Sequence, residues 1–191
     1  MCYFLAAGVS EPRMWGDMSD RMRFLVWLCL SLFATGAAPG AERETITYEM
    51  DPGWKIGNSQ GTKHYSIMEF IPEGDDIQNW KELFTVQNFT GRWGESSPEE
   101  TMNALKAKRE KNCPGTTQWN VIDKNKDSIL FEWQAKPCLG WPEQHEIARI
   151  LYGKYNRWYL RYTAKVYQLP QETRAKWVKI LSEAFIRRFK S

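Results

Sequence analysis

The stretch that decides the fold is Gly53–Phe89, GWKIGNSQGTKHYSIMEFIPEGDDIQNWKELFTVQNF, in which short apolar runs alternate with turns rich in Gly, Asn and Asp. Each run is too short for a helix and is dense in the aromatic and branched residues that suit a pleated surface. Residues 65–71 alternate between two faces, residues 73–76 break the pattern, and residues 80–89 resume it. The stretch therefore predicts a strand, a wide turn and a second strand. It holds no nucleophile, metal cluster or phosphate loop, so we interpret it as scaffold.

The composition indicates one globular domain after an N-terminal segment. The chain has 191 residues, of which 42% are apolar and 14% aromatic, and this is ample for a single core. The formal net charge is only +3, and residues 1–41 contribute none of it because their three arginines balance three acidic residues. So weak a charge gives no reason to expect nucleic-acid binding.

The N-terminal segment has the pattern of a secretory signal peptide. Arg21 and Arg23 precede the apolar run FLVWLCLSLF at residues 24–33, and the small-residue stretch ATGAAPGA follows it. The run is shorter than the roughly 20 apolar residues that cross a bilayer, so we expect no stable membrane anchor after cleavage. The alternative is a buried N-terminal helix.

The pattern also suggests where the chain starts and is cleaved. Residues 1–21 are too long and too mixed in charge for the charged region of a signal peptide, so translation from Met18 or Met22 fits better than translation from Met1. Cleavage after Ala37 or Ala41 fits the small-residue stretch. We therefore divide the chain into a cleavable segment, residues 1–41, and a single domain, residues 42–191.

Cysteine usage predicts one disulfide. Cleavage would remove Cys2 and Cys29 and leave Cys113 and Cys138 in a compartment that oxidises thiols. A bond between the two would close a loop of about 25 residues. A metal pair or a redox couple is the alternative, but the chain has no Cys-x-x-Cys, and neither histidine has metal-ligand spacing to a thiol.

A first helix is predicted from Ser97 to about Lys111. Ser97 can cap it, Pro98 suits its first position, and Glu100 completes a Ser-x-x-Glu capping box. Met102, Leu105 and Ala104 would face the core. Lys106, Lys108, Arg109 and Lys111 gather near the end, where cations suit the helix dipole; we interpret this cluster as a solvated helix end, with a binding site as the alternative.

Further strands are predicted at residues 45–50, 54–56, 117–122, 128–134, 146–152 and 158–167. On the last of these, Trp158, Leu160, Tyr162, Ala164 and Val166 share an apolar face. The other face carries Tyr159, Arg161, Thr163 and Lys165, and we expect solvent to account for it.

The chain is predicted to end in a helix from about Pro170 to Phe189. One stripe is apolar and the opposite face is basic; the stripe consists of Trp177, Val178, Leu181, Ala184, Phe185 and Phe189. Such a helix could lie on an anionic membrane. We favour a helix that covers the sheet, because the sheet needs a cover.

These elements predict an α+β fold in which an antiparallel sheet of about six to seven strands is covered by two helices. The order of three strands, a helix, four strands and a long helix resembles the PsbP-like α/β/α sandwich, a fold shared with small exported bacterial proteins of uncharacterised function. The resemblance covers roughly residues 46–189 and is carried by YSIMEFIPEGDDIQNWKELFTVQNF, SPEETMNALKAKREKNC and WVKILSEAF. It implies a binding or assembly factor rather than an enzyme, and it assigns no functional residue.

The functional hypothesis is a non-catalytic binding or assembly module, periplasmic or secreted, whose partner is an envelope protein or a small ligand. An interaction surface could be drawn from Trp93, Trp141 and Tyr159. A small-molecule carrier is the first alternative, and a hydrolase the second. His64 and His145 are the only histidines and have no convincing serine or cysteine partner by local spacing, so we predict no catalytic, cofactor or metal residues.

Overall fold

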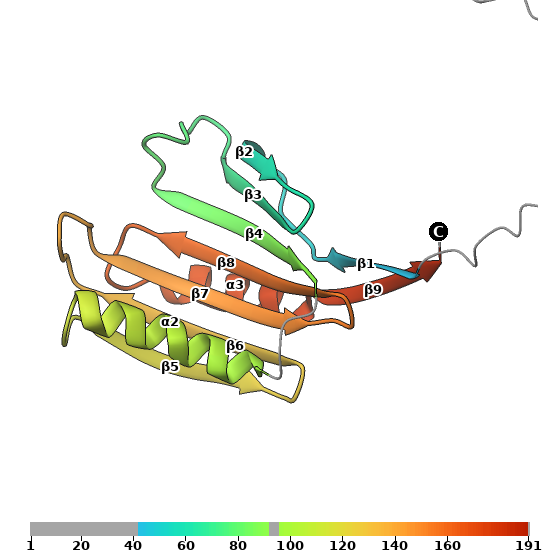
Figure 1. The fold of residues 1–191 in the computed structure, drawn as a ribbon. Coiled ribbons are helices and arrows are strands. Elements are labelled where there is room, and N and C mark those ends of the chain that lie inside the picture. Colours follow the sequence, from blue (N-terminus) through green and yellow to red (C-terminus); the bar gives the residue numbers. More distant parts are fainter. Residues whose placement is uncertain (1–41, 92–95, 191) are drawn as a thin grey trace, which may run out of the picture. The chain divides into compact units, whose positions relative to one another are not determined.

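The computed structural model describes residues 42–91 and 96–190, and seven antiparallel strands form its main sheet (Figure 1). The sheet order is β2-β3-β4-β8-β7-β6-β5. Its strands are β2 (Trp54–Gly61), β3 (Tyr65–Pro72), β4 (Glu82–Thr90), β5 (Thr117–Lys124), β6 (Ser128–Ala135), β7 (Gln144–Tyr152) and β8 (Asn156–Ala164). Two helices pack on it, α2 (Pro98–Asn112) and α3 (Gln171–Glu183). The α+β fold predicted from the sequence is therefore confirmed.

The face of the sheet that α3 covers, here called the α3 face, holds an aromatic core. Alternation along β8 places Trp158, Leu160, Tyr162 and Ala164 on this face. Trp177 of α3 stacks on Tyr162 with ring centroids 4.3 Å apart and lies 5.1 Å from Phe84 of β4. Leu181, one turn further along α3, is fully buried. The apolar stripe of α3 and the apolar residues that alternate along the strands thus pack in one cluster.

The opposite face, here called the α2 face, is only partly covered. Met102 and Leu105 of α2 pack on a second apolar cluster, which includes Ile129, Phe131, Trp133, Ala135, Ala148 and Ile150. In Figure 1 the helix lies over β5, β6 and β7, and its main contacts are with these strands. No helix of the described residues covers β2, β3 and β4 on this face. Ala104, which the sequence placed toward the core, is exposed.

The predicted capping box and disulfide are both present. The backbone N–H of Glu100 donates to Ser97 Oγ at 3.2 Å, and the backbone N–H of Ser97 donates to Glu100 Oε2 at 2.7 Å. At the other end of α2, Cys113 is bonded to Cys138 with an S–S distance of 2.09 Å. The disulfide ties the end of α2 to the loop between β6 and β7.

The predicted C-terminal helix is wrong beyond Glu183. Residues 185–190 form a strand, β9 (Phe185–Lys190), which pairs with β1 (Glu42–Thr47) in a separate two-stranded sheet. The helix stops where Nη1 of Arg149 on β7 donates to three carbonyl groups at its end, those of residues 181, 182 and 184, at 2.7, 2.5 and 2.9 Å. Phe185 and Phe189, expected on the buried stripe, are 54% and 43% exposed.

The first strands also differ from their predicted bounds. The strand expected at residues 45–50 is β1 at Glu42–Thr47, and its partner is β9 rather than the main sheet. The short strand expected at residues 54–56 is the eight-residue β2. Four strands therefore precede α2, and a ninth strand follows α3.

A buried carboxylate attaches the two-stranded sheet to the main sheet. Glu44 of β1 accepts hydrogen bonds from the three consecutive backbone N–H groups of residues 154–156, at 2.8, 2.9 and 3.1 Å, and from Arg188 Nε at 3.1 Å. Burial alone would raise the pKa of Glu44, but these donors outweigh it and the pKa is lowered. A Cβ at Gly153 would overlap the carboxylate, so a larger residue there would displace Glu44 from its donors.

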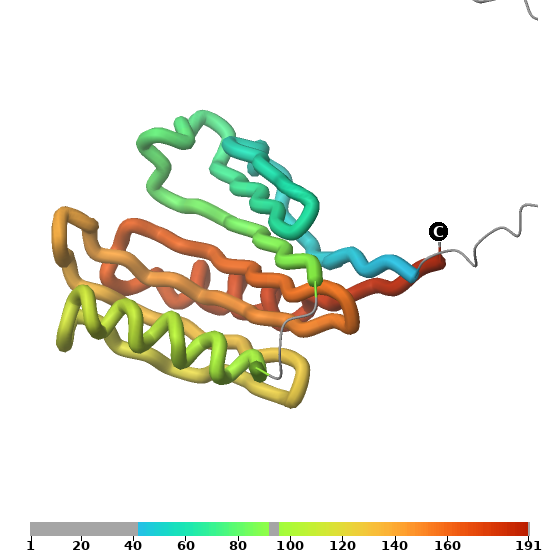
Figure 2. Tube along the Cα trace, in the orientation of Figure 1, coloured from blue at the N-terminus to red at the C-terminus, as the bar shows by residue number. Residues whose placement is uncertain are grey.

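The predicted signal peptide and its cleavage sites lie in residues 1–41, outside the described residues. Within the described ranges, neither helix has the length and apolar character needed to cross a membrane. Figure 2 traces the chain as a tube and shows β4 and β8, far apart in the sequence, side by side in the sheet.

Candidate functional site

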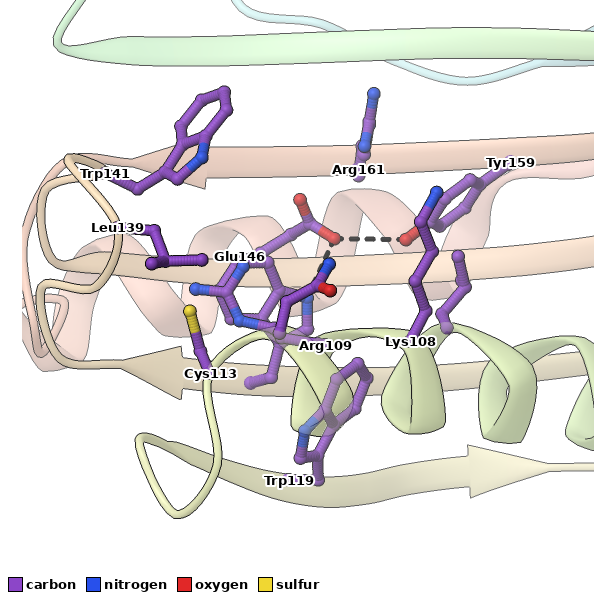
Figure 3. Close-up of a pocket in the computed structure, with 12 residues that line it drawn as sticks. Lys108, Arg109, Cys113, Trp119, Leu139, Trp141, Glu146, Tyr159 and Arg161 are labelled. Atoms are coloured by element: carbon purple, nitrogen blue, oxygen red, sulfur yellow. Dashed lines mark hydrogen bonds between the residues drawn. The ribbon is translucent and has the colours of Figure 1, made fainter.

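The α2 face carries a recess beside the last turns of α2 (Figure 3). Its volume is about 450 Å³, and a second hollow of about 400 Å³ continues from it toward β3 and β4. We call the two hollows together the α2-face recess. Both are lined by Arg109, Trp133, Trp141, Glu146 and Arg161.

Glu146 is the buried carboxylate of the recess. The period of β7 turns its side chain toward α2, and it is 4% exposed. Its Oε1 accepts hydrogen bonds from Trp133 Nε1 at 3.0 Å and from the Tyr159 hydroxyl at 3.1 Å, as the dashed lines in Figure 3 mark. Its Oε2 accepts from Thr163 Oγ1 at 2.8 Å. Three neutral donors thus hold the carboxylate in one orientation.

Two arginines lie close to this carboxylate without pairing with it. The Arg109 guanidinium lies 4.1 Å from the centroid of the Trp133 ring, and its Nε donates to Thr117 Oγ1 at 3.1 Å. The Arg161 guanidinium lies 5.3 Å from the Tyr159 ring centroid. Its Nε is buried and has no hydrogen-bond partner among the described residues. Within those residues, neither arginine has a carboxylate oxygen within 4.0 Å.

The three groups around Glu146 keep their ordinary charge states at neutral pH. Burial lowers the pKa of Arg109, and Glu146 opposes that shift. Burial would also lower the pKa of Arg161, but Glu146 and Tyr159 outweigh the effect of burial and raise this pKa. Burial, followed by the charge of Glu146, raises the pKa of Tyr159 well above its ordinary value. Both arginines are therefore positive, and the Tyr159 hydroxyl stays protonated and donates to Glu146.

The rim of the recess is a tight turn held by the disulfide. Leu139 and Gly140 have φ values of 50° and 81°, and the backbones of Cys138 and Trp141 on either side are hydrogen-bonded at 3.1 and 2.9 Å. Positive φ is unfavourable for a residue with a Cβ, so Leu139 is held there at some cost. The turn leaves Leu139 75% and Trp141 65% exposed.

The structure brings together two of the three residues proposed as an interaction surface. Trp141 on the rim and Tyr159 on β8 line the same hollow. Tyr159 is half-buried, and its hydroxyl is engaged by Glu146. Trp93 lies outside the described residues.

The expectation that solvent accounts for the polar face of β8 is wrong. Tyr159, Arg161 and Thr163 line the recess, because β8 is an inner strand whose neighbours β4 and β7 flank these side chains. Lys165, just after the end of β8, lies with its Nζ 4.2 Å from the Trp80 ring centroid. The sequence does contain a signal, because Arg161 interrupts the apolar run of residues 158–162.

The basic cluster at the end of α2 is likewise only partly a solvated helix end. Lys108 and Arg109 line the recess, and Arg109 is half-buried. Lys106 and Lys111 are exposed, as expected for a solvated face.

His145 is enclosed on the other side of the sheet. It is fully buried; its Nδ1 accepts from the backbone N–H of Leu169 at 3.0 Å, and its Nε2 lies 3.3 Å from Glu132 Oε2. Arg174 of α3 donates to both oxygens of Glu132 at 2.7 Å, and Asn120 Nδ2 donates to Oε1 at 2.9 Å. Burial lowers the pKa of His145, so the ring is neutral and acts as a link between strands. We call this group the Glu132 clamp.

The other histidine, His64, is exposed in the turn between β2 and β3. Across residues 42–91 and 96–190, no group of three or more His, Cys, Asp and Glu side chains is arranged to hold a metal ion.

No protein-family model matches this chain, and no curated protein matches it. The geometry of the α2-face recess therefore carries the functional interpretation.

Proposed function

We propose that this chain is a non-catalytic binding module of the periplasm or of the secreted fraction, and that the α2-face recess takes a small ligand. The observation that carries the proposal is the recess itself. Its larger hollow, about 450 Å³, is lined by four aromatic side chains together with aliphatic, polar and charged ones. A hollow of this size, with apolar walls and convergent polar groups, is typical of small-molecule sites.

The states of the titratable groups support binding over catalysis. Both oxygens of Glu146 already accept hydrogen bonds from neighbouring side chains. His145 is buried in the Glu132 clamp on the α3 face. Neither group is arranged as a base that could reach a substrate in the recess.

The compartment is proposed from two independent features. The Cys113–Cys138 disulfide suits an oxidising environment, and the sequence of residues 21–41 has the pattern of an export signal. The layering of helix, sheet and helix also supports the resemblance to PsbP-like proteins, which act mostly by binding. That family relationship remains part of the proposal.

Native mass spectrometry of protein purified from the envelope fraction of its host tests the ligand. We expect a retained small-molecule mass in the wild type that is lost in Trp141→Ala. Ile56→Ala is the matched control, because Ile56 is also an exposed large apolar residue and lies outside the recess. Loss of the mass in both variants, or its absence from the wild type, would contradict the proposal.

An assembly factor is the second candidate, and the exposed Leu139 and Trp141 favour it. Apolar side chains this exposed on a rigid turn are suited to protein contacts. A pull-down from the envelope fraction distinguishes the two functions. Capture of one protein by the wild type and by Ile56→Ala, but not by Trp141→Ala, in material without a retained small molecule would favour assembly.

A further inference from the structure

We propose that the ligand of the α2-face recess is a monoanionic organic acid whose carboxylate binds the Arg161 guanidinium and whose flat apolar body lies beside Trp141. This inference rests on the proposed function, because it names the ligand class of the same recess.

The first support is an incomplete set of hydrogen bonds at the floor of the recess. Buried polar groups are nearly always hydrogen-bonded in native proteins, yet Arg161 Nε has no partner among the described residues. Thr85 of β4 lies directly opposite Arg161 in the β4–β8 register, and its buried Oγ1 also lacks a partner there. Two neighbouring unsatisfied groups mark a place where a ligand can complete the hydrogen bonding.

The acidic residues of the recess do not meet this need. Both oxygens of Glu146 are engaged by Trp133, Tyr159 and Thr163. Glu69, on β3, accepts a hydrogen bond from Asn58 Nδ2 at 2.8 Å. Neither carboxylate forms an ion pair with Arg161 within the described residues. The Nε–H of Arg161 is therefore left to donate to a ligand.

The net charge of the residues that line the recess indicates the charge of the ligand. The positive side chains that line it are Lys108, Arg109 and Arg161, and the negative ones are Glu69 and Glu146, so the lining carries one net positive charge. Complementarity to one positive charge favours a monoanion over a dianion such as a phosphate ester. A carboxylate also matches the planar fork of a guanidinium with two parallel hydrogen bonds.

The aromatic side chains in the walls of the recess indicate the shape of the apolar part of the ligand. Trp119 packs against Trp133 with ring centroids 5.9 Å apart, and Arg109 lies over Trp133. Trp141 stands at the rim, largely exposed, with its indole available to a planar group. Aromatic faces and a stacked guanidinium favour flat rings over branched aliphatic chains.

Two acids with neutral counterparts test the inference. The probes are 2-naphthoate and indole-3-acetate, each compared with its amide, which has nearly the same shape without the charge. Binding is followed by tryptophan fluorescence and by calorimetry at pH 7 and low salt. We expect at least one acid to bind the wild type at least tenfold more tightly than its amide.

Three variants test whether the tighter binding of the acid depends on Arg161. Arg161→Met should weaken binding of that acid at least tenfold and leave binding of its amide unchanged. Arg161→Lys keeps the charge but loses the fork, so its loss should be smaller; it also provides a folded variant if Arg161→Met fails to fold. Arg187→Met is the matched control, because Arg187 is exposed on β9, and its affinities should equal those of the wild type.

Failure of this inference and failure of the proposed function give different results. Equal binding of each acid and its amide, weakened in both cases by Trp141→Ala, would overturn the acid inference and leave a ligand-binding recess. If no probe binds, the mass retained from the host decides: an organic acid supports the inference, and a neutral or cationic compound overturns it. No probe binding and no retained mass would overturn both.

Discussion

Glu132 on β6 and Glu146 on β7 occupy neighbouring strands but face opposite sides of the sheet, and the two carboxylates differ in the charge of their hydrogen-bond donors. Glu132 on the α3 face is paired with Arg174, which donates to both of its oxygens at 2.7 Å. Glu146 on the α2 face accepts only from neutral donors, although Arg109 and Arg161 lie near it. Arg174 thus closes its carboxylate in an ion pair, whereas Arg161, beside a carboxylate that already has its donors, keeps its Nε–H without a partner among the described residues.

The same contrast extends to the helices. On the α3 face, Leu181 and Trp177 fill a continuous aromatic core. On the α2 face, Leu105 is only partly buried and borders the recess. We therefore expect substitutions on the α3 face to affect mainly stability and substitutions in the recess to affect mainly binding.

The largest expected effect is that of Leu181→Ala. Leu181 is fully buried, and its truncation should lower the free energy of unfolding by about 4 kcal/mol through lost contacts and a cavity. Leu105→Ala, the matched change on the α2 face, should cost about 1 kcal/mol because the side chain is half-exposed. Urea unfolding followed by circular dichroism measures both. Equal losses would show that the two faces are equally closed.

The second-largest loss of stability is expected on removal of the disulfide, which supports the rim of the recess. The double substitution Cys113→Ala and Cys138→Ala opens a loop with a sequence separation of 25 and should cost about 3.5 kcal/mol in the chain-entropy account. Urea unfolding of the double variant beside the oxidised wild type measures the loss. A change below about 1 kcal/mol would mean that the loop is fixed by its other contacts alone.

Replacing one arginine on each face compares the two carboxylates directly. Arg174→Met leaves Glu132 buried without its ion pair and should cost about 2 to 3 kcal/mol, a value reduced because Arg174 is partly exposed. Arg161→Met removes no ion pair seen among the described residues and should change stability by less than about 1 kcal/mol. The thermal midpoints of the two variants measure this difference. A larger loss for Arg161→Met would contradict the comparison.

Acid should weaken the Glu132 clamp in a defined pH range. Burial would raise the pKa of Glu132, but hydrogen bonds from Arg174 and Asn120 outweigh it and lower the pKa from 4.5 to about 2. A carboxyl group with a lowered pKa stabilises the fold above its unfolded pKa, and that contribution is lost as the pH falls. From pH 5 to pH 3 this group should therefore cost about 2 kcal/mol.

Glu132→Gln is the control for this effect, because the amide does not titrate. Urea unfolding of both proteins at pH 5, 4 and 3 separates Glu132 from the other acidic groups. The stability of the variant should fall by about 2 kcal/mol less than that of the wild type over this range. Parallel curves would mean that Glu132 is not the titrating group.

The sheet could be predicted from the sequence because its information is local. The alternation in residues 65–71 and 128–134 and the capping box at Ser97 each act within a few residues. The end of the last helix could not be predicted in this way. Phe185 and Phe189 are four residues apart, which suits a helix face, but they also alternate with Arg187, which suits a strand. Pairing with β1, at the far end of the chain, decides between them.

The recess was missed for a related reason. The sequence shows that Arg161 interrupts an apolar run, but not that β8 lies between β4 and β7. Nor does it show that α2 passes over one part of this face, so that Arg109 reaches the same hollow. The role of a charged residue in an inner strand cannot be predicted until the strands on both sides of it are known.

The pairing of β4 with β8 also has a consequence for the order of folding. Strands β2 to β4 and strands β5 to β8 are each neighbours in sequence, so each group can form from local contacts; only β4–β8, which joins Glu82 to Ala164, links them into one sheet. Because distant pairings are slow to form, we expect this junction to limit the folding rate. Thr85 and Arg161 lie on its two sides, so the proposed ligand site can form only after the junction has formed. A bound ligand should accordingly slow unfolding and leave the folding rate unchanged.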